Sequence, residues 1–187
     1  MNLLHRWACR SAFWKSQLER RIIPWTLDEV ALGDDALEIG PGPGLTTDVL
    51  RTMAERLTCI EIDQRLAADL AQRLHGSSVK VVEGDATEMP FPDGSFSGAV
   101  SLTMLHHVPS REGQDRLLAE VCRVLRPGAW FAGSDSLTSL RWRLYHLFDT
   151  CVPVDPETFG ERLSRAGFVD PAVDSNPRAF RFRARKP

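Results

Sequence analysis

The amino-acid sequence predicts a doubly wound α/β domain, and three observations support that prediction. Short apolar runs alternate with helical patterns between about residues 35 and 135. A turn rich in glycine and proline directly follows the first run. The composition is ordinary for a globular protein, with 43% hydrophobic and 26% charged residues, and 187 residues correspond to about one domain. Strands separated by helices of this length imply βαβ units and therefore a mostly parallel sheet.

The central segment contains five predicted strands, which are the apolar runs 36–39, 57–62, 79–82, 96–102 and 129–132. Between them, apolar residues recur every three or four positions in three predicted helices, at 46–56, 66–74 and 117–125. We expect Pro127 and Gly128 to end the third helix. Ligands of doubly wound sheets bind outside the carboxyl ends of the strands, so functional residues should directly follow the strands.

Two flanks lie outside this repeat. Residues 1–31 carry an apolar helical stripe with arginines among its members, and we expect them to form a helical cap over the ligand crevice. Residues 136–187 contain a predicted helix at 156–166 and then a terminal hairpin. In the last predicted strand two phenylalanines and an alanine alternate with Arg181, Arg183 and Arg185. The basic face of that strand either is solvated or contacts an acidic substrate or phosphate.

The composition also excludes several classes of protein and site. Lysine and arginine number 23 and aspartate and glutamate 25, so the net charge of −2 argues against a uniformly basic nucleic-acid-binding surface. None of the four cysteines has a Cys or His at metal-ligand spacing, so we expect neither a metal site nor a disulfide framework. No signal peptide is recognisable, and no apolar run approaches the roughly 18 residues of a membrane span, which predicts a cytoplasmic protein.

The clearest local signal is the glycine loop Glu38-Ile-Gly40-Pro-Gly42-Pro-Gly44-Leu45 after the first strand. Glycines allow a tight turn and let a ligand lie against the main chain. A dinucleotide fingerprint would place its third glycine at position 45, which is leucine here. The two prolines of the loop have no N–H group to donate to a pyrophosphate. The loop therefore suits a ligand that approaches the backbone closely and carries no phosphate.

Carboxylates follow the next two strands. Glu61 lies 21 positions after Gly40, and an acid at about this distance can bind both hydroxyls of a ribose. Asp85 follows the third strand and can accept a hydrogen bond from an exocyclic amine. With Glu38 and Asp63, these residues give an acidic crevice that fits a positively charged nucleoside.

Together, these motifs resemble those of class I S-adenosylmethionine-dependent methyltransferases. Three more sequences strengthen the resemblance, namely Phe91-Pro-Asp-Gly-Ser-Phe96, Leu105-His106-His107-Val108 and Val124-Leu-Arg-Pro-Gly128. They are similar to the branch that methylates small molecules, which includes the ubiquinone and menaquinone methyltransferases. The resemblance implies a Rossmann-like methyltransferase fold with seven strands, in a single domain 1–187 whose cofactor-binding core is 35–135. It also implies that residues 136–187 supply an acceptor-side helix and the terminal hairpin.

The resemblance implies S-adenosylmethionine as cofactor and S-adenosylhomocysteine as product. Gly40, Gly42 and Gly44 would pass under the methionine and ribose parts of the cofactor. Glu38 would help to hold the amino-acid end, and Glu61 would bind the ribose hydroxyls.

The remaining matched positions concern adenine and the methyl group. Asp85 and the backbone of Ala86 would read the edge of adenine, and Ile62 would pack on its face. Thr103, after the fourth strand, would lie near the methyl group.

His106 and His107 are the candidate catalytic residues. A hydroxyl acceptor benefits from a general base, and histidine suits that task near neutral pH. The competing interpretation is that both histidines only position the loop. Tyr145 and His146 are further candidates for contact with a small-molecule acceptor, whose pocket we expect between the N-terminal cap and residues 136–155.

Several other functions stay open. The stretch from Glu38 to Asp63 also resembles rRNA adenine dimethyltransferases, but these carry an Asn-Leu/Ile-Pro-Tyr/Phe motif where this chain has Ser101-Leu-Thr-Met-Leu-His106, which argues against a nucleic-acid substrate. Tryptophans and arginines of the first flank favour a lipid-amine methyltransferase with peripheral membrane contact. A doubly wound fold is also compatible with a non-catalytic S-adenosylmethionine-binding module, or with an NAD-dependent oxidoreductase, which Leu45 and the loop prolines disfavour. The oligomeric state is open as well.

Overall fold

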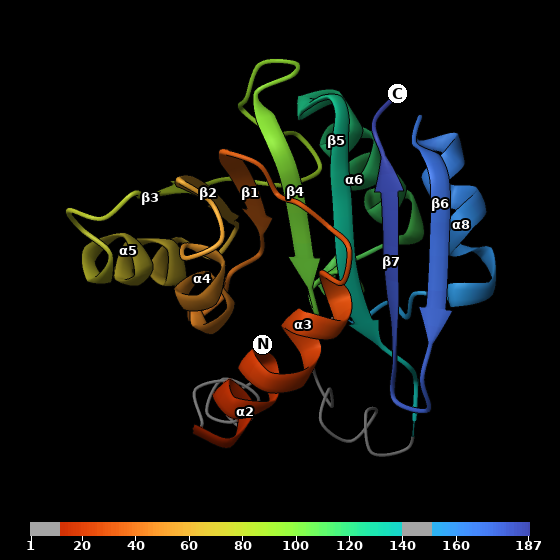
Figure 1. Ribbon diagram of the computed structural model, residues 1–187, viewed down its shortest axis with the longest axis horizontal. Coiled ribbons are helices and arrows are strands. Elements are labelled where there is room, and N and C mark those ends of the chain that lie inside the picture. Colours follow the sequence, from red (N-terminus) through yellow and green to blue (C-terminus); the bar gives the residue numbers. More distant parts are fainter. Residues whose placement is uncertain (1–11, 140–150) are drawn as a thin grey trace.

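The computed structural model describes residues 12–139 and 151–187 and contains seven strands: β1 (Asp35–Ile39), β2 (Arg56–Glu61), β3 (Val79–Glu83), β4 (Phe96–Leu102), β5 (Leu125–Ser136), β6 (Val169–Ser175) and β7 (Ala179–Arg185). They form one sheet in the order β3-β2-β1-β4-β5-β7-β6 (Figure 1). The first five strands pair in parallel, whereas β7 is antiparallel to both β5 and β6. The predicted doubly wound, mostly parallel sheet of seven strands is therefore confirmed.

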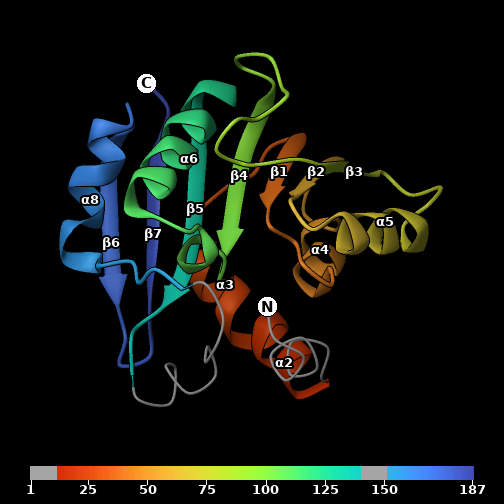
Figure 2. The same cartoon turned by 180° about the vertical axis from the view of Figure 1, so that it is seen from behind.

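Helices cover both faces of this sheet (Figures 1 and 2). On one face lie α6 (Arg111–Val124) and α8 (Pro156–Arg165). The N-terminal helices lie on the opposite face and comprise α2 (Ala12–Gln17), the π-helical turn η1 (Leu18–Ile22) and α3 (Ile23–Thr26). Two more helices, α4 (Leu45–Leu50) and α5 (Gln64–Arg73), connect β1, β2 and β3. The described part of the chain contains no helix with the length and apolarity to cross a membrane.

The central strands supply side chains to two apolar cores, one on each face. Ala99 and Val100 are consecutive in β4, yet Ala99 packs in the core beneath α6 and α8, and Val100 packs in the core beneath the N-terminal helices. Phe131 and Ala132 divide in the same way in β5. Both side-chain directions are buried, so the strands carry apolar residues on both faces rather than a strict alternation of apolar and polar residues. This is why they were recognisable in the sequence.

The C-terminal hairpin shows the alternation that its sequence predicts. Phe180 and Phe182 are fully buried against α8. The rings of Phe182 and Phe159 pack edge to face, with their centroids 4.8 Å apart. The arginines of β7 point the other way, but two of them are paired. Arg181 donates to the carbonyl of Trp25 at 2.6 Å, and Arg183 donates to Glu29 at 2.9 Å. Two arginines of the basic face therefore hold the N-terminal segment on the sheet, whereas Arg185 is exposed.

Two boundary predictions were wrong. The helix predicted at 46–56 ends at Leu50, because Arg56 already belongs to β2, where it is in register with Asp35 of β1. Strand pairing outweighs the local helical pattern there. The helix α6 ends at Val124, and Pro127 and Gly128 lie inside β5, next to an irregularity in its register with β4.

Candidate functional site

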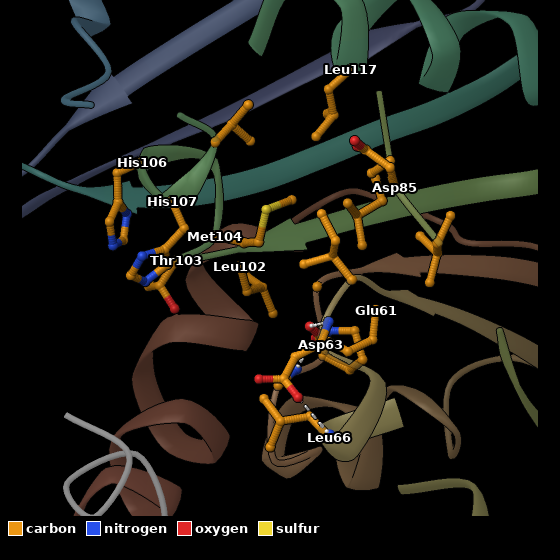
Figure 3. A pocket seen from close by; sticks show the side chains of 18 of the residues that line it. Glu61, Asp63, Leu66, Asp85, Leu102, Thr103, Met104, His106, His107 and Leu117 are labelled. Atoms are coloured by element: carbon orange, nitrogen blue, oxygen red, sulfur yellow. Dashed lines mark hydrogen bonds between the residues drawn. The ribbon is translucent and has the colours of Figure 1, made fainter. Parts of the chain in front are cut away.

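A cavity of about 620 Å³ opens at the carboxyl ends of β1, β2, β3, β4 and β5. It brings together most of the residues that the sequence singled out. Those on its wall are Gly40, Gly42, Glu61, Ile62, Asp85, Ala86, Thr103, His106 and His107. Figure 3 shows three groups of side chains around the space: Glu61 with Asp63, Asp85 with Leu117, and the two histidines with Thr103. The two other predicted positions, Glu38 and Gly44, are not part of the wall.

The glycine loop takes a backbone path that only glycine follows without strain. The φ angles of Gly40, Gly42 and Gly44 are +66°, +55° and +83°. A Cβ atom at Gly40 would collide with Cγ of Met104, whereas a Cβ atom at Gly42 would meet no atom within 4 Å. Gly42 therefore faces open space on the cavity wall, where a side chain would take room from a ligand. The loop fits the predicted role of a surface on which an elongated ligand lies.

Glu61 ends β2 beside this loop and is 6% exposed. Its Oε2 accepts a hydrogen bond from the backbone N–H of Gly42 at 2.9 Å, and its Oε1 accepts one from the N–H of Asp63 at 3.0 Å. Each carboxylate oxygen has a second lone pair, so Glu61 can also accept from hydroxyl groups of a ligand. Asp63 caps the start of α5 by accepting from two backbone N–H groups of its first turn.

The wall also carries an exposed apolar side chain and a further carboxylate. Ile62 is 70% exposed, which is unusual for an isoleucine and leaves a flat apolar surface for a ring to cover. Asp85 uses Oδ1 to accept from the N–H of Thr87 at 2.8 Å and has its other oxygen for a ligand amine. These two residues have the chemistry expected of an adenine site.

Glu38 lies behind the glycine loop, 3% exposed. It accepts hydrogen bonds from the hydroxyls of Thr46 and Thr47 at the start of α4, and from the thiol of Cys59 at 3.3 Å. Burial raises the pKa of the Glu38 carboxyl, and burial together with the Glu38 charge raises the pKa of the Cys59 thiol. In this position Glu38 ties β1 and β2 to α4 and thereby supports the loop from below.

Thr103 directly follows β4 with a φ of +53°, which is rare for a β-branched residue. Its N–H donates to the carbonyl of Ser134 in β5 at 2.8 Å, so the strand pairing fixes this backbone. The chain then turns through the short 3₁₀ helix η2 (Leu105–His107), which places both histidines on the cavity wall (Figure 3). Strained residues held by their surroundings are typical of functional sites.

The structure also reveals a residue that the sequence reasoning missed. Asp135, near the end of β5, is fully buried, and its Oδ1 lies 2.5 Å from Nδ1 of His106. The two rings of His106 and His107 lie 4.1 Å apart. A signal was present, because Asp135 follows the fifth apolar run, and functional residues were expected after each strand.

The N-terminal helices complete the wall on the histidine side. Trp14 of α2 and Leu18 of η1 contribute apolar surface, and Ser136 at the end of β5 contributes a hydroxyl. The candidates Tyr145 and His146 lie outside the described residues. Among the described residues of the wall, Arg116 of α6 is the cationic one, and it is exposed.

Comparisons with known proteins bear on this site. A family model described as a methyltransferase domain matches residues 37–133, which hold the glycine loop, both carboxylates and both histidines. A probable ribosomal RNA small subunit methyltransferase A of Natronomonas pharaonis is 41% identical over 102 residues, or 52% of this chain and 36% of that protein. The O-methyltransferase resE of Aspergillus sclerotiorum is 28% identical over 149 residues, or 73% of this chain and 55% of that protein.

One solved structure shows the same fold over nearly the whole chain. Phosphoethanolamine N-methyltransferase 2 of Haemonchus contortus, in complex with S-adenosylmethionine, superposes with a TM-score of 0.79 and 16% identity. The match covers 98% of this chain and 56% of that structure. The chain thus spans about a third to about a half of the length of these relatives.

Proposed function

The chain belongs to the methyltransferase domain family, and on this premise we propose that it transfers a methyl group from S-adenosylmethionine to a small-molecule acceptor. One observation carries the proposal. The glycine loop, Glu61, Asp85 and the two histidines come from four separate parts of the sequence, yet they line a single cavity. The family match supports both the class of enzyme and the cofactor.

The residues of the wall fit the cofactor in one orientation. Glu61 would accept from the ribose hydroxyls, while Asp85 would accept from the adenine amine and the N–H of Ala86 would donate to the ring. Ile62 would cover the face of adenine. Gly42 offers the open backbone surface along which the methionine part would lie. Glu38 would act on the amino-acid end through the loop that it supports, because it does not reach the cavity wall.

Methyl transfer depends more on aligning the acceptor atom with the methyl group than on activating the methyl group. Bound S-adenosylmethionine supplies a methyl group that its positively charged sulfur already activates. The contribution of the chain is to hold an acceptor atom in line with that methyl group and to exclude water from the path. Thr103, His106 and His107 line the part of the cavity where an acceptor would lie, with Trp14 and Leu18 as its apolar cover. The proposal also covers the division of the domain: the core 35–135 would bind the cofactor, and the cap 1–31 would cover the acceptor.

Calorimetric titration with S-adenosylhomocysteine, with NAD as control ligand, tests the cofactor assignment. We expect S-adenosylhomocysteine to bind in the micromolar range and NAD not to bind. Glu61→Gln and Asp85→Asn should each weaken binding by about 1–3 kcal/mol, because a buried hydrogen bond to the ligand is lost. The matched control is Glu83→Gln, since Glu83 is in register with Glu61 on the adjacent strand but is not on the wall. Unchanged binding in both site variants would refute the placement of the cofactor.

The similarity to a probable ribosomal RNA methyltransferase makes rRNA a second candidate acceptor. Two features of this chain argue against it. After β4 the chain has Thr103 and Met104, with no asparagine to grip a flipped adenine and no aromatic ring to stack on it. Two arginines of the basic face of β7 are paired with acidic side chains, Arg181 with Asp28 and Arg183 with Glu29. The test is to incubate the protein with tritiated S-adenosylmethionine and a transcript of small-subunit rRNA. We expect no tritium in the RNA, and its incorporation would make rRNA the acceptor.

A further inference from the structure

The second half of the glycine loop is held by one arginine of the next βαβ unit. Arg73 is the last residue of α5, and its Nη2 donates to the carbonyl of Gly44 at 3.0 Å and to that of Pro43 at 3.4 Å. Its Nη1 donates to both carboxylate oxygens of Asp48 in α4, at 2.7 and 2.9 Å. The guanidinium group therefore joins the loop to the helix that follows it.

The composition of the loop explains why a donor from outside is needed. Its prolines have no N–H group. The N–H groups of its three glycines are all used within the protein, and their acceptors are the Ile60 carbonyl for Gly40, the Glu61 carboxylate for Gly42 and the Pro41 carbonyl for Gly44. The end of the loop can therefore be fixed only through carbonyl oxygens. Arginine suits this task, because its five N–H donors can bind two carbonyls and a carboxylate at once.

The backbone of Gly44 is shaped for this contact. Its φ angle is +83°, and a Cβ atom there would collide with Nη2 of Arg73 and with Cδ1 of Leu70. Glycine at this position thus permits the left-handed turn and also lets two side chains of α5 reach the main chain. Leu70 is 2% exposed, so an apolar contact and a charged one meet the loop at the same point.

A second hollow, of about 300 Å³, leaves the guanidinium group open to solvent. It lies between α4 and α5, and both Arg73 and Asp48 line it. Their side chains are 42% and 23% exposed, and ion pairs as exposed as this contribute little to stability. Among the described hydrogen bonds, however, Arg73 provides the only side-chain donors to the carbonyls of Pro43 and Gly44. Its effect should therefore be on the shape of the loop more than on the fold.

We propose that Arg73 is a positioning residue for the cofactor, because it fixes the end of the glycine loop in the conformation that receives the methionine part of S-adenosylmethionine. The inference rests on the proposed function. Glu61 fixes the middle of the loop and lines the cofactor cavity, whereas Arg73 is not on the wall of that cavity and acts through the loop. Both residues belong to the unit of β2 and α5, so one part of the fold holds the loop at two points.

Calorimetric titration with two ligands tests this role. S-adenosylhomocysteine and 5′-methylthioadenosine share the adenosine and the sulfur, but the second lacks the amino-acid end. In Arg73→Gln we expect S-adenosylhomocysteine to bind about tenfold more weakly, and 5′-methylthioadenosine to bind as in the wild type. Arg73→Lys should show most of the same loss, because one ammonium group cannot reproduce the geometry of the guanidinium.

Arg51→Gln is the matched control. Arg51 pairs with the same carboxylate, Asp48, at 3.9 Å, and the described contacts give its side chain no bond to the loop. Both ligands should bind to this variant as to the wild type. Unchanged binding of S-adenosylhomocysteine to Arg73→Gln, or an equal loss for the two ligands, would overturn the proposal.

Chemical rescue separates positioning from stability. In Arg73→Ala the hollow between α4 and α5 is open, so a guanidinium ion can enter the place of the lost side chain. Millimolar guanidinium chloride should restore part of the affinity for S-adenosylhomocysteine, compared with sodium chloride at equal ionic strength. If Arg73 only stabilised the fold there would be no recovery, because guanidinium favours the unfolded state. Absence of recovery would therefore count against the positioning role.

Hydrogen exchange of the Gly44 amide measures the loop without any ligand, because this N–H donates to the carbonyl of Pro41 at 2.9 Å. Exchange should be about tenfold faster in Arg73→Gln and unchanged in Arg51→Gln. If the wild type binds neither ligand but Gly44 responds in this way, the proposed function has failed and the hold of Arg73 on the loop remains. If Gly44 does not respond, Arg73 does not fix the loop.

Discussion

At the scale of single residues, Glu38 lies behind the glycine loop and not on the cavity wall. The resemblance implied that it helps to hold the amino-acid end of the cofactor, and the structure places it beneath the loop. There it binds Thr46, Thr47 and Cys59. A buried carboxyl surrounded by hydroxyl and thiol donors is satisfied, yet its charged form lacks water. The glycine loop is therefore supported by the Glu38 carboxyl, whose ionisation is opposed by burial.

This predicts a dependence of stability on pH. Burial raises the pKa of Glu38 in the folded state above its value in the unfolded chain, so the folded state retains a proton that the unfolded state releases. Its contribution to the free energy of unfolding is therefore full at low pH. It declines as pH rises above the ordinary glutamate value of about 4.3 and through the folded-state pKa. Glu38→Gln cannot ionise and lacks this decline.

Urea unfolding of wild type and Glu38→Gln at several pH values measures the effect as a difference. Relative to the variant, the wild type should lose stability as pH rises. The lowered pKa values of Asp34 and Glu120 act in the opposite direction, but both proteins share them, so they cancel. A constant difference between the two proteins would contradict the prediction.

Two glycines of the loop give a second prediction at this scale. Gly42→Ala should lower the free energy of unfolding by about 1–2 kcal/mol, the cost of a left-handed conformation for a residue with a Cβ. Gly40→Ala should cost more, because its methyl group also collides with Met104. Gly42→Ala should still weaken S-adenosylhomocysteine binding about tenfold or more, since Gly42 lines the cavity and no protein atom occupies the space of the added methyl group. Unfolding curves and calorimetry check both effects, and equal stability of the two variants would contradict the first.

At the scale of elements, arginines of β7 hold the N-terminal segment on the sheet through hydrogen bonds. Arg181 donates to the Trp25 carbonyl and lies 5.6 Å from the centre of its indole ring, while Arg185 lies over Trp130 within the sheet. We predict that Arg181→Gln lowers the hydrogen-exchange protection of residues 23–30 about tenfold, because a charge-assisted hydrogen bond to that segment is lost. Arg185→Gln is the matched control and should leave that protection unchanged. Equal effects of both variants would mean that β7 does not hold the segment.

The strands β4 and β5 show which parts of the fold could be predicted from the sequence. The run 96–102 coincides with β4, because burial on both faces enriches the strand in apolar residues, with Phe96 and Ala99 in one core and Val100 and Leu102 in the other. The strand predicted at 129–132 extends to Ser136, but Gly133, Ser134 and Asp135 carry no apolar signal. Their extended conformation comes from pairing with β7, a partner about 50 residues away in the chain, and, for Gly133 and Ser134, also from pairing with β4. The contact between Asp135 and His106 was therefore hidden, although the histidine itself was recognised as a candidate.

At the scale of the whole molecule, one cavity joins the ends of β1 to β5, so ligand binding should stabilise the entire domain. S-adenosylhomocysteine at about 100 times its Kd should add about 2.7 kcal/mol to the free energy of unfolding. For a domain of this size that corresponds to a rise in Tm of about 5–10 °C. Differential scanning calorimetry measures the shift, and Glu61→Gln should reduce it at the same ligand concentration. A Tm that does not respond to the ligand would mean that the cavity is not its site.

The place of β7 has a consequence for how the protein is made. This strand lies between β5 and β6 in the sheet, yet it is synthesised after all the others. Until it leaves the ribosome, β5 has an open edge, β6 has no partner, and the segment that follows α3 lacks the arginines that hold it. The helices α2 and α3, of which α2 contributes to the cavity wall, are thus translated before the strand that holds their segment on the sheet. A nascent chain stalled before residue 179 would present an exposed strand edge, the kind of surface on which chaperones act and aggregation begins.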